Sequence, residues 1–268
     1  MKTYVITLER SIERYRYIKK HVIERLLDYE IIPAVDGSKL KEDDLIKLTD
    51  YEKVKRLRWW LTDGAIGCAL SHLNAYQAFL NTNDNAAFII EDDVNLPADI
   101  NNLLFEIEKV VRPDEIILLY YTSFKPTKFS TVGSVKLSKG GLYYPMDIGE
   151  PISAAAYTIG KEAALNLKNK ILPIRVTADN WSYFYEISAF STLRVHFPAQ
   201  INTKNFKSSI DYLPKNSFKS KISNFVNRYK IFPLFQIFNY LRKKRLNKML
   251  YHFSLCDEIS PTYKKLNP

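Results

Sequence analysis

The stretch Ala86-Ala-Phe-Ile-Ile-Glu-Asp-Asp-Val94 decides the fold class. Its first five residues are all apolar, which is typical of a strand buried on both faces, and three carboxylates follow at once. In an open α/β sheet, ligands bind beyond the carboxyl ends of the strands. The stretch therefore predicts a central strand that ends in an acidic site.

Strands and helices alternate on both sides of this stretch. Short apolar runs predict buried strands at residues 4–8, 29–35, 116–121, 154–159 and 192–197. Helices are expected over residues 11–27, 39–58, 64–79, 99–110 and 161–170, with Ser11 and Asp63 as N-caps, and residues 122–150 predict only short strands and loops. This alternation predicts one α/β sheet with helices on both faces.

The composition excludes several kinds of site. None of the eight glycines falls into G-x-G-x-x-G or G-x-x-x-x-G-K-[ST], so a bound nucleotide would need another cradle. The two cysteines, Cys68 and Cys256, are too few for a disulfide framework or a zinc site, and Cys68 is expected to be a buried packing residue. The chain shows neither a signal-peptide pattern nor a run of about 20 apolar residues. We therefore expect an intracellular protein that does not span a membrane.

The net charge of +10 is concentrated near the C-terminus. Residues 204–248 hold 12 Lys/Arg and one acid, Asp211, whereas the rest of the chain holds 27 Lys/Arg and 28 acids. The chain is expected to divide into a catalytic domain, residues 1–203, and a basic helical region, residues 204–268.

The acidic triplet Glu91-Asp92-Asp93 admits two interpretations. Carboxylate oxygens suit Mg²⁺ or Mn²⁺ bridging a diphosphate, and a cation would relieve the repulsion between three adjacent carboxylates. The alternative is a solvated turn in which one Asp caps the next helix.

A set of motifs in a fixed order accompanies the triplet. They are Val5-Ile-Thr-Leu8, Arg14, Asp36-Gly37, Gly64-x-x-Gly67-Cys68-x-x-Ser71-His72 and Ile90-Glu91-Asp92-Asp93-Val94. In this order the motifs resemble glycosyltransferase family 25, the family of lipooligosaccharide galactosyltransferases and related collagen galactosyltransferase domains. The resemblance covers roughly residues 1–200.

The resemblance implies a GT-A fold, a UDP-sugar donor, a divalent cation and inversion at the anomeric carbon. Carried onto this sequence, it places Glu91 or Asp92 near the ribose and Asp93 on the metal, with Glu91 as a second candidate ligand. Thr7 and Leu8 of the first motif are assigned to the nucleotide in the same way.

Five polar residues outside the triplet are further candidates for donor binding. Arg10 and Arg14 could pair with the diphosphate or the uracil edge, or could be solvated charges on a helix. Asp36 could hold the uridine or simply form an Asp-Gly turn. Ser71 and His72 could reach a phosphate or sugar hydroxyl, or could be satisfied core residues.

An inverting transferase needs a carboxylate that accepts the proton of the acceptor hydroxyl. Asp179, beside the aromatic Trp181, is the first candidate, and a helix N-cap is its alternative role. Glu150 is the second candidate.

The sequence departs from the family pattern in two strands. Ser153-Ala-Ala-Ala-Tyr157 stands where the family usually has a G-T-x-G-Y pattern. Leu118-Leu-Tyr-Tyr-Thr122 lacks the basic and acidic pair that often ends its strand. Because both lie where sugars would bind, the donor sugar is the least transferable part of the resemblance.

The basic region predicts two amphipathic helices, over residues 217–230 and 233–250, with the cationic cluster Arg242–Arg245 in the second. Such helices are typical of an anionic membrane surface, and a helical pair docked on the catalytic domain is the alternative. No nucleic-acid motif accompanies the charge.

The sequence therefore predicts an inverting, Mn²⁺- or Mg²⁺-dependent transferase. It would move a sugar, with galactose favoured, from a UDP-sugar to lipooligosaccharide or another bacterial surface glycan, at the inner face of the cytoplasmic membrane. The alternatives are a nucleotidyltransferase of similar fold, or a non-catalytic membrane-associated scaffold.

Overall fold

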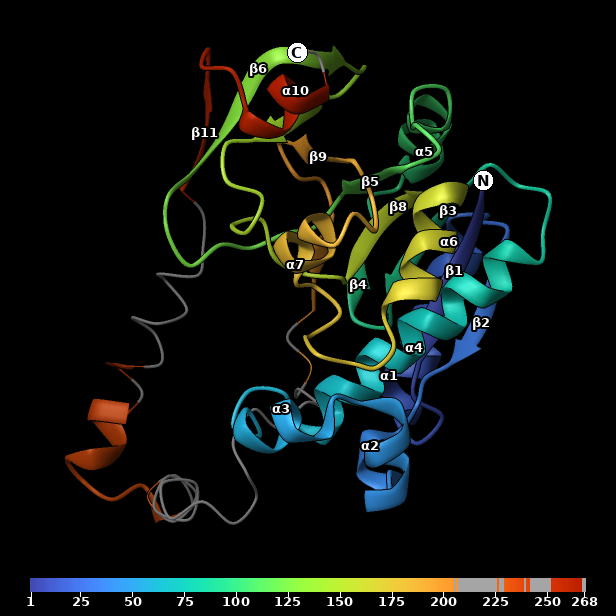
Figure 1. Cartoon of the computed structure of the whole chain (residues 1–268). Coiled ribbons are helices and arrows are strands. Elements are labelled where there is room, and N and C mark those ends of the chain that lie inside the picture. Colours follow the sequence, from blue (N-terminus) through green and yellow to red (C-terminus); the bar gives the residue numbers. More distant parts are fainter. Residues whose placement is uncertain (205, 207–225, 227–228, 239, 242–251, 267–268) are drawn as a thin grey trace.

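The computed structural model describes residues 1–204, 206, 226, 229–238, 240–241 and 252–266. A nine-stranded mixed sheet runs through these residues in the order β11-β6-β7-β9-β5-β8-β3-β1-β2 (Figure 1). Its strands are β1 (Lys2–Thr7), β2 (Tyr29–Pro33), β3 (Ala86–Glu91), β5 (Glu115–Leu118), β6 (Thr127–Lys136), β7 (Gly141–Pro145), β8 (Ala156–Gly160), β9 (Thr192–Phe197) and β11 (Phe253–Cys256). The expected α/β sheet is confirmed.

Seven of the nine strands run in the same direction, and β7 and β8 run against them. The strand β1 lies between β2 and β3 and is parallel to both. The carboxyl ends of these three strands therefore meet at one edge of the sheet, where Ile6 stands opposite Glu91. Because β8 is antiparallel, its first residues reach the same edge, and Ala156 pairs with Ile90.

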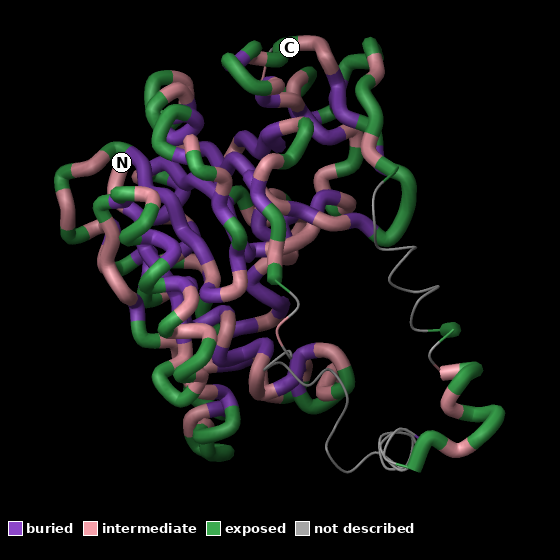
Figure 2. The backbone as a smooth tube through the Cα atoms, turned by 180° about the vertical axis from the view of Figure 1, so that it is seen from behind, coloured by how far each residue is buried: buried purple, intermediate pink, exposed green. Residues whose placement is uncertain are grey.

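Helices cover both faces of the sheet, as the alternating pattern predicts. The helices are α1 (Ile12–Glu24), α2 (Glu42–Leu48), α3 (Tyr51–Arg56), α4 (Asp63–Leu80), α5 (Ile100–Glu108), α6 (Lys161–Lys170), α7 (Trp181–Glu186) and α10 (Pro261–Leu266). Side chains of α1 and α5 pack in one core with Phe88 and Ile90, and those of α4, α6 and α7 pack in another with Ala87 and Ile89. Alternate residues of β3 thus face opposite cores, and Figure 2 shows this central part of the chain as buried.

Several local predictions were wrong. The helix expected over residues 39–58 is interrupted at Thr49–Asp50, because Asp50 begins α3 by accepting a hydrogen bond from the Lys53 amide. Thr62, not Asp63, caps α4, and Ser11 stands at the N-cap of α1 without a capping hydrogen bond from its hydroxyl. Residues 122–150 contain β6, whose ten residues make it far longer than a short strand.

The end of the chain returns to the sheet. The strand β11 pairs in parallel with β6, and Ser260 donates a hydrogen bond to the Pro145 carbonyl of β7 at 2.7 Å. Residues 253–266 therefore belong to the same body as residues 1–203, and the boundary expected at residue 204 does not separate them. Most of the two helices expected over 217–230 and 233–250, with the cluster 242–245, lies outside the described residues. Within the described part, no helix combines the length and apolar character needed to cross a membrane.

The helix α4 lies against the turn that follows β2. A Cβ atom on Gly67 would lie 2.6 Å from the Val35 carbonyl oxygen and 2.8 Å from the Gly37 amide nitrogen. A Cβ on Gly37 would lie 1.9 Å from the carbonyl oxygen of Asp63. The motif glycines therefore allow two backbones to touch, which no other residue type would permit.

We predict that Gly67→Ala lowers the free energy of unfolding by about 1–3 kcal/mol, because the added methyl group must push apart two packed backbones. Urea denaturation measures this change. Gly149→Ala is the matched control, since its nearest neighbour would be 3.4 Å from the new Cβ. Equal midpoints for the two variants would contradict the close packing of α4 on the turn.

Candidate active site

The acidic triplet lies at the carboxyl edge of the sheet, beside the end of β1. Because Ile6 pairs with Glu91, the next residue of β1, Thr7, reaches Asp92 and donates a hydrogen bond to it at 2.8 Å. Only 6% of Asp92 is exposed. The interpretation of the triplet as a solvated turn is therefore wrong, and β4 (Val94–Asn95) follows it instead of a capped helix.

Arg14, which α1 contributes, supplies positive charge to the triplet. Its Nη2 lies 2.5 Å from Asp92 Oδ1 and 2.9 Å from Asp93 Oδ2, and 13% of its side chain is exposed. One guanidinium group thus holds two carboxylates at the strand end. This contact excludes the interpretation of Arg14 as a solvated helix charge.

The carboxyls of the triplet are only partly neutralised. Burial raises the pKa of Asp92, and burial together with the charge of Glu91 raises the pKa of Asp93 to about 7. The Oδ1 atom of Asp93 is buried and has no hydrogen-bond partner. Since a buried carboxylate oxygen without a partner is costly, this arrangement suits a bound cation.

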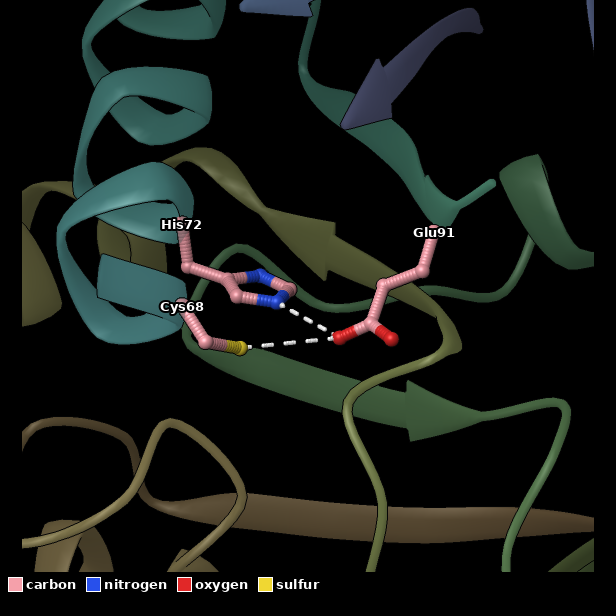
Figure 3. A group of neighbouring side chains, drawn as sticks. All are labelled: Cys68, His72 and Glu91. Carbon is pink, nitrogen blue, oxygen red and sulfur yellow. Dashed lines mark hydrogen bonds and ion pairs between the residues drawn. The ribbon is translucent and has the colours of Figure 1, made fainter. Parts of the chain in front are cut away.

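The side chain of Glu91 points toward α4, and not toward Arg14, which binds Asp92 and Asp93. Its Oε1 lies 3.4 Å from His72 Nε2 and 3.7 Å from Cys68 Sγ (Figure 3). Burial opposes ionisation of Glu91, but the hydrogen bond and charge of His72 outweigh it, and the pKa of Glu91 is lowered. Burial and the nearby charge of Glu91 raise the pKa of the Cys68 thiol well above its usual value.

His72 is fully buried and connects Glu91 with two tyrosines. Its Nδ1 lies 2.8 Å from the Tyr157 hydroxyl, which in turn lies 2.9 Å from the Tyr76 hydroxyl. Sequence reasoning missed these tyrosines and also Cys68, which is more than a packing residue. The spacing of Cys68, His72 and Tyr76, one helical turn each, was the signal that could have grouped them.

Asp179 lies near the same cluster. Burial raises the pKa of Asp179, to which the charge of Glu91 adds, and the charge of Asp179 in turn acts on the Cys68 thiol. Asn180, not Asp179, caps α7 by accepting a hydrogen bond from the Tyr183 amide. The alternative role for Asp179 as an N-cap is therefore wrong.

Glu150, the second candidate for the base, belongs to a different group of residues. It accepts a hydrogen bond from Ser123 at 2.7 Å and forms an ion pair with Lys125 at 2.8 Å. These two contacts occupy both carboxylate oxygens of Glu150, whereas Asp179 interacts electrostatically with Glu91.

Arg10 and Asp36 pair with each other. Arg10 donates to both carboxylate oxygens of Asp36, at 2.6 and 3.2 Å, and Asp36 also accepts from the Ser38 amide and hydroxyl. These bonds outweigh the effect of burial and lower the pKa of Asp36. Asp36 thus forms the expected Asp-Gly turn and also holds Arg10 at the sheet edge.

Ser71 and Leu8 have structural contacts. Ser71 is 1% exposed; its hydroxyl accepts from the Val35 amide at 2.8 Å and donates to the Gly67 carbonyl at 2.6 Å. The Leu8 carbonyl accepts from the Ser11 amide at 2.9 Å and closes the turn before α1. Ser71 fixes the turn that carries Asp36, so its effect on a ligand would be indirect.

The strand that departs from the family pattern carries local strain. Ser153 has a φ of 127°, a conformation that favours glycine, and its carbonyl accepts a hydrogen bond from Trp181 Nε1 at 3.2 Å. The family resemblance expects glycine at this position, and the φ of Ser153 is one that glycine adopts readily. Strain of this kind is common where a backbone approaches a ligand.

The start of the basic region contacts the site, which the sequence did not predict. Asn202–Thr203 (β10) pairs with β4, and the Lys204 amide donates to the Asp93 carbonyl at 2.7 Å. The Phe206 ring lies 5.8 Å from the Arg14 guanidinium carbon. These contacts hold the backbone after the triplet in place.

The protein comparisons agree on one family. The model of glycosyltransferase family 25 (LPS biosynthesis protein) matches residues 1–182. A Haemophilus influenzae protein provisionally named a glycosyltransferase is 31% identical over 180 residues, which are 65% of this chain and 60% of that protein. The lipooligosaccharide biosynthesis protein lic2B of Haemophilus influenzae is 26% identical over 172 residues, or 63% of this chain and 62% of that protein.

A mouse relative, procollagen galactosyltransferase 2, is 28% identical over 109 residues, which are 39% of this chain and 17% of that protein. The chain thus spans less than two thirds of the length of each of these relatives. Among solved structures, a Bacillus anthracis protein provisionally named a glucose-1-phosphate thymidylyltransferase matches 76% of this chain and 89% of its own, with 11% identity and a TM-score of 0.37. A likeness at that score bears on neither fold nor function.

Proposed function

The chain belongs to glycosyltransferase family 25, and from this membership we propose that it is an inverting, metal-dependent transferase of the GT-A type. The donor would be a UDP-sugar, with galactose favoured, and the acceptor lipooligosaccharide or another bacterial surface glycan. One observation carries the proposal: a buried strand ends in three carboxylates, and one oxygen of Asp93 is buried without a hydrogen-bond partner.

A divalent cation, Mn²⁺ or Mg²⁺, fits this place. Asp93 would hold it through its unpartnered oxygen, and Glu91 is the second candidate ligand. The pKa values of Asp92 and Asp93 are raised, so their ionised forms are disfavoured in the free protein. A bound cation would stabilise those ionised forms, which supports the assignment. When bound, the cation neutralises charge that develops on the departing diphosphate.

The chain's own residues would bind and orient the donor. Arg14 and Arg10 lie at the ends of β1 and α1, where their guanidinium groups are held by Asp92, Asp93 and Asp36. In the free protein these ion pairs hold the arginines where the diphosphate and the uridine of the donor are expected to bind. Thr7, through Asp92, positions the carboxylate that the resemblance places near the ribose.

Asp179 is the proposed general base. The acceptor hydroxyl oxygen attacks the anomeric carbon, the bond from that carbon to the diphosphate oxygen breaks, and the hydroxyl proton passes to the Asp179 carboxylate. Burial raises the pKa of Asp179, which increases its affinity for that proton. Its electrostatic interaction with Glu91 and His72 supports this role over that of Glu150, which Lys125 holds as an ion pair.

The C-terminal region is proposed to bind the inner face of the cytoplasmic membrane. Between residues 229 and 241, six large apolar side chains are exposed: Tyr229, Phe232, Leu234, Ile237, Tyr240 and Leu241. Residues 204–248 carry 12 Lys/Arg and one acid. Apolar side chains that insert, together with basic residues that attract anionic lipid, would place the site near a lipid-linked acceptor.

We predict that Asp93→Ala abolishes sugar transfer and Mn²⁺-dependent UDP binding while the protein stays folded, because Asp93 supplies the open metal ligand. Calorimetry with UDP, with and without Mn²⁺, and a donor hydrolysis assay measure this. Asp84→Ala, an acid just before the other end of β3, is the control. Full activity of Asp93→Ala with Mn²⁺ would exclude the metal assignment.

We predict that Asp179→Asn slows transfer by a factor on the order of 10²–10⁴ and leaves UDP affinity nearly unchanged, as loss of a general base should. Glu150→Gln should have a much smaller effect on the rate. If the two variants exchange these phenotypes in steady-state kinetics, Glu150 is the base.

We predict that changing Phe232, Ile237 and Leu241 together to Ser weakens binding to anionic vesicles about tenfold or more, because each buried side chain contributes about 1.5–3 kcal/mol. Phe105→Ser on α5 is the control, since Phe105 is also well exposed, at 59%. Co-sedimentation with phosphatidylglycerol vesicles measures binding, which should also weaken as salt rises.

Truncation after Thr203 is a poorer test of the membrane proposal, because it would also remove the helix α10 and the edge strand β11 of the sheet. Unchanged vesicle binding of the triple variant would show that these side chains do not insert.

A further inference from the structure

Three side chains of different chemistry converge beside the acidic triplet. Cys68 Sγ, His72 and Glu91 bring one ligand atom each within 4.8 Å of one another (Figure 3). Cys68 and His72 stand one turn apart on α4 and so share a face of the helix, whereas Glu91 comes from the end of β3. The cluster is therefore built by the packing of α4 on the sheet.

The spacing of these atoms matches that of ligands around a zinc ion. With Zn–S about 2.3 Å and Zn–N or Zn–O about 2.1 Å in a tetrahedron, the sulfur–oxygen separation is about 3.6 Å and the nitrogen–oxygen separation about 3.4 Å. The corresponding distances here are 3.7 Å from Cys68 Sγ to Glu91 Oε1 and 3.4 Å from His72 Nε2 to Glu91 Oε1. Two of the three separations thus match, and the third, between the sulfur and the imidazole nitrogen, is within 4.8 Å, so a bound ion would draw these two atoms together by about 1 Å at most.

The far side of the imidazole ring is also arranged as metal sites require. A histidine that binds a metal through one nitrogen usually forms a hydrogen bond through the other, which fixes the orientation of the ring. His72 Nδ1 lies 2.8 Å from the Tyr157 hydroxyl, and that hydroxyl lies 2.9 Å from Tyr76. With the ring held in this way, Nε2 faces Glu91.

We propose that Cys68, His72 and Glu91 bind a soft divalent cation, Zn²⁺ or a close chemical relative, with a fourth position open. A sulfur, an imidazole nitrogen and one carboxylate oxygen favour Zn²⁺ over Mg²⁺ or Mn²⁺, which prefer oxygen ligands alone. Glu91 has 27% of its side chain exposed, and Cys68 is partly exposed, so an ion can reach the cluster from solvent. On binding, the thiol proton of Cys68 leaves to water and the thiolate coordinates the ion.

This site is distinct from the hard-cation site assigned to Asp93, although Glu91 is a candidate ligand in both. Counting cysteines did not predict it, because two of its three ligands are His and Glu from separate elements. Binding of Zn²⁺ is a property of the folded chain and does not require sugar transfer. The two proposals can therefore fail independently.

Metal binding by the full chain tests the proposal. Cobalt(II), which takes the place of zinc in such sites, should give the wild-type protein a thiolate-to-cobalt charge-transfer band, and Zn²⁺ should abolish that band. Cys68→Ser should remove the band and weaken Zn²⁺ binding in calorimetry by a factor on the order of 100 or more, since thiolate is a strong zinc ligand. Cys256→Ser, which changes the second free, partly exposed cysteine, should keep both.

Two further variants distinguish loss of the metal site from a failure of the protein to fold. Glu91→Gln changes a partly exposed side chain without changing its size, and it should weaken Zn²⁺ binding while circular dichroism stays native. Asp93→Ala should keep the cobalt band. Absence of the band in the wild-type protein, its loss in Cys256→Ser or Asp93→Ala, or unchanged Zn²⁺ affinity in Cys68→Ser would overturn the proposal.

Discussion

The burial of carboxylates at the end of β3 is the constraint on which the rest of the site depends. The strand is central and apolar, so its parallel neighbour β1 and the helices on both faces limit the access of water to the residues at its end. Buried charges are stable only when other groups compensate them. Each carboxylate of the triplet accordingly has a partner: His72 for Glu91, Thr7 for Asp92, and Arg14 shared between Asp92 and Asp93. The remaining Asp93 oxygen has none.

The helix α4 connects this acidic edge with the turn after β2. Gly67 and Ser71 hold it against Val35 and Gly37, while Cys68 and His72, on the same helix, contact Glu91. A displacement of α4 would therefore move both the Asp36 turn and the partners of Glu91. Within the family motif on this helix, Gly67 and Ser71 pack against the backbone of the turn after β2, and Cys68 and His72 contact the acidic site.

The last part of the chain has two separate relations to the site. At its beginning, Asn202 and Thr203 pair with β4, Lys204 contacts Asp93 and Phe206 contacts Arg14, and its end adds β11 to the far edge of the sheet. The basic, apolar segment therefore begins and ends in residues that belong to the catalytic body. A membrane-binding segment placed in this way would hold the acidic edge at a limited distance from the lipid surface.

The sequence by itself determined the α/β class, the central strand over residues 86–90 and the position of the acids at its end, because apolar periodicity and residue type are local properties. It also determined the family, through motifs that keep their order. Only the tertiary structure decided which groups interact: that Arg14 joins Asp92 to Asp93, that Cys68 faces Glu91, and that the charge of Glu91 acts on Asp179. Likewise, the helical pattern of residues 39–58 did not reveal the interruption at Asp50, and the composition of the tail did not reveal β11. Side-chain contacts in this protein join residues as many as 130 positions apart, as between Lys128 and Glu258. Such pairs depend on how whole elements pack, which local sequence patterns do not record.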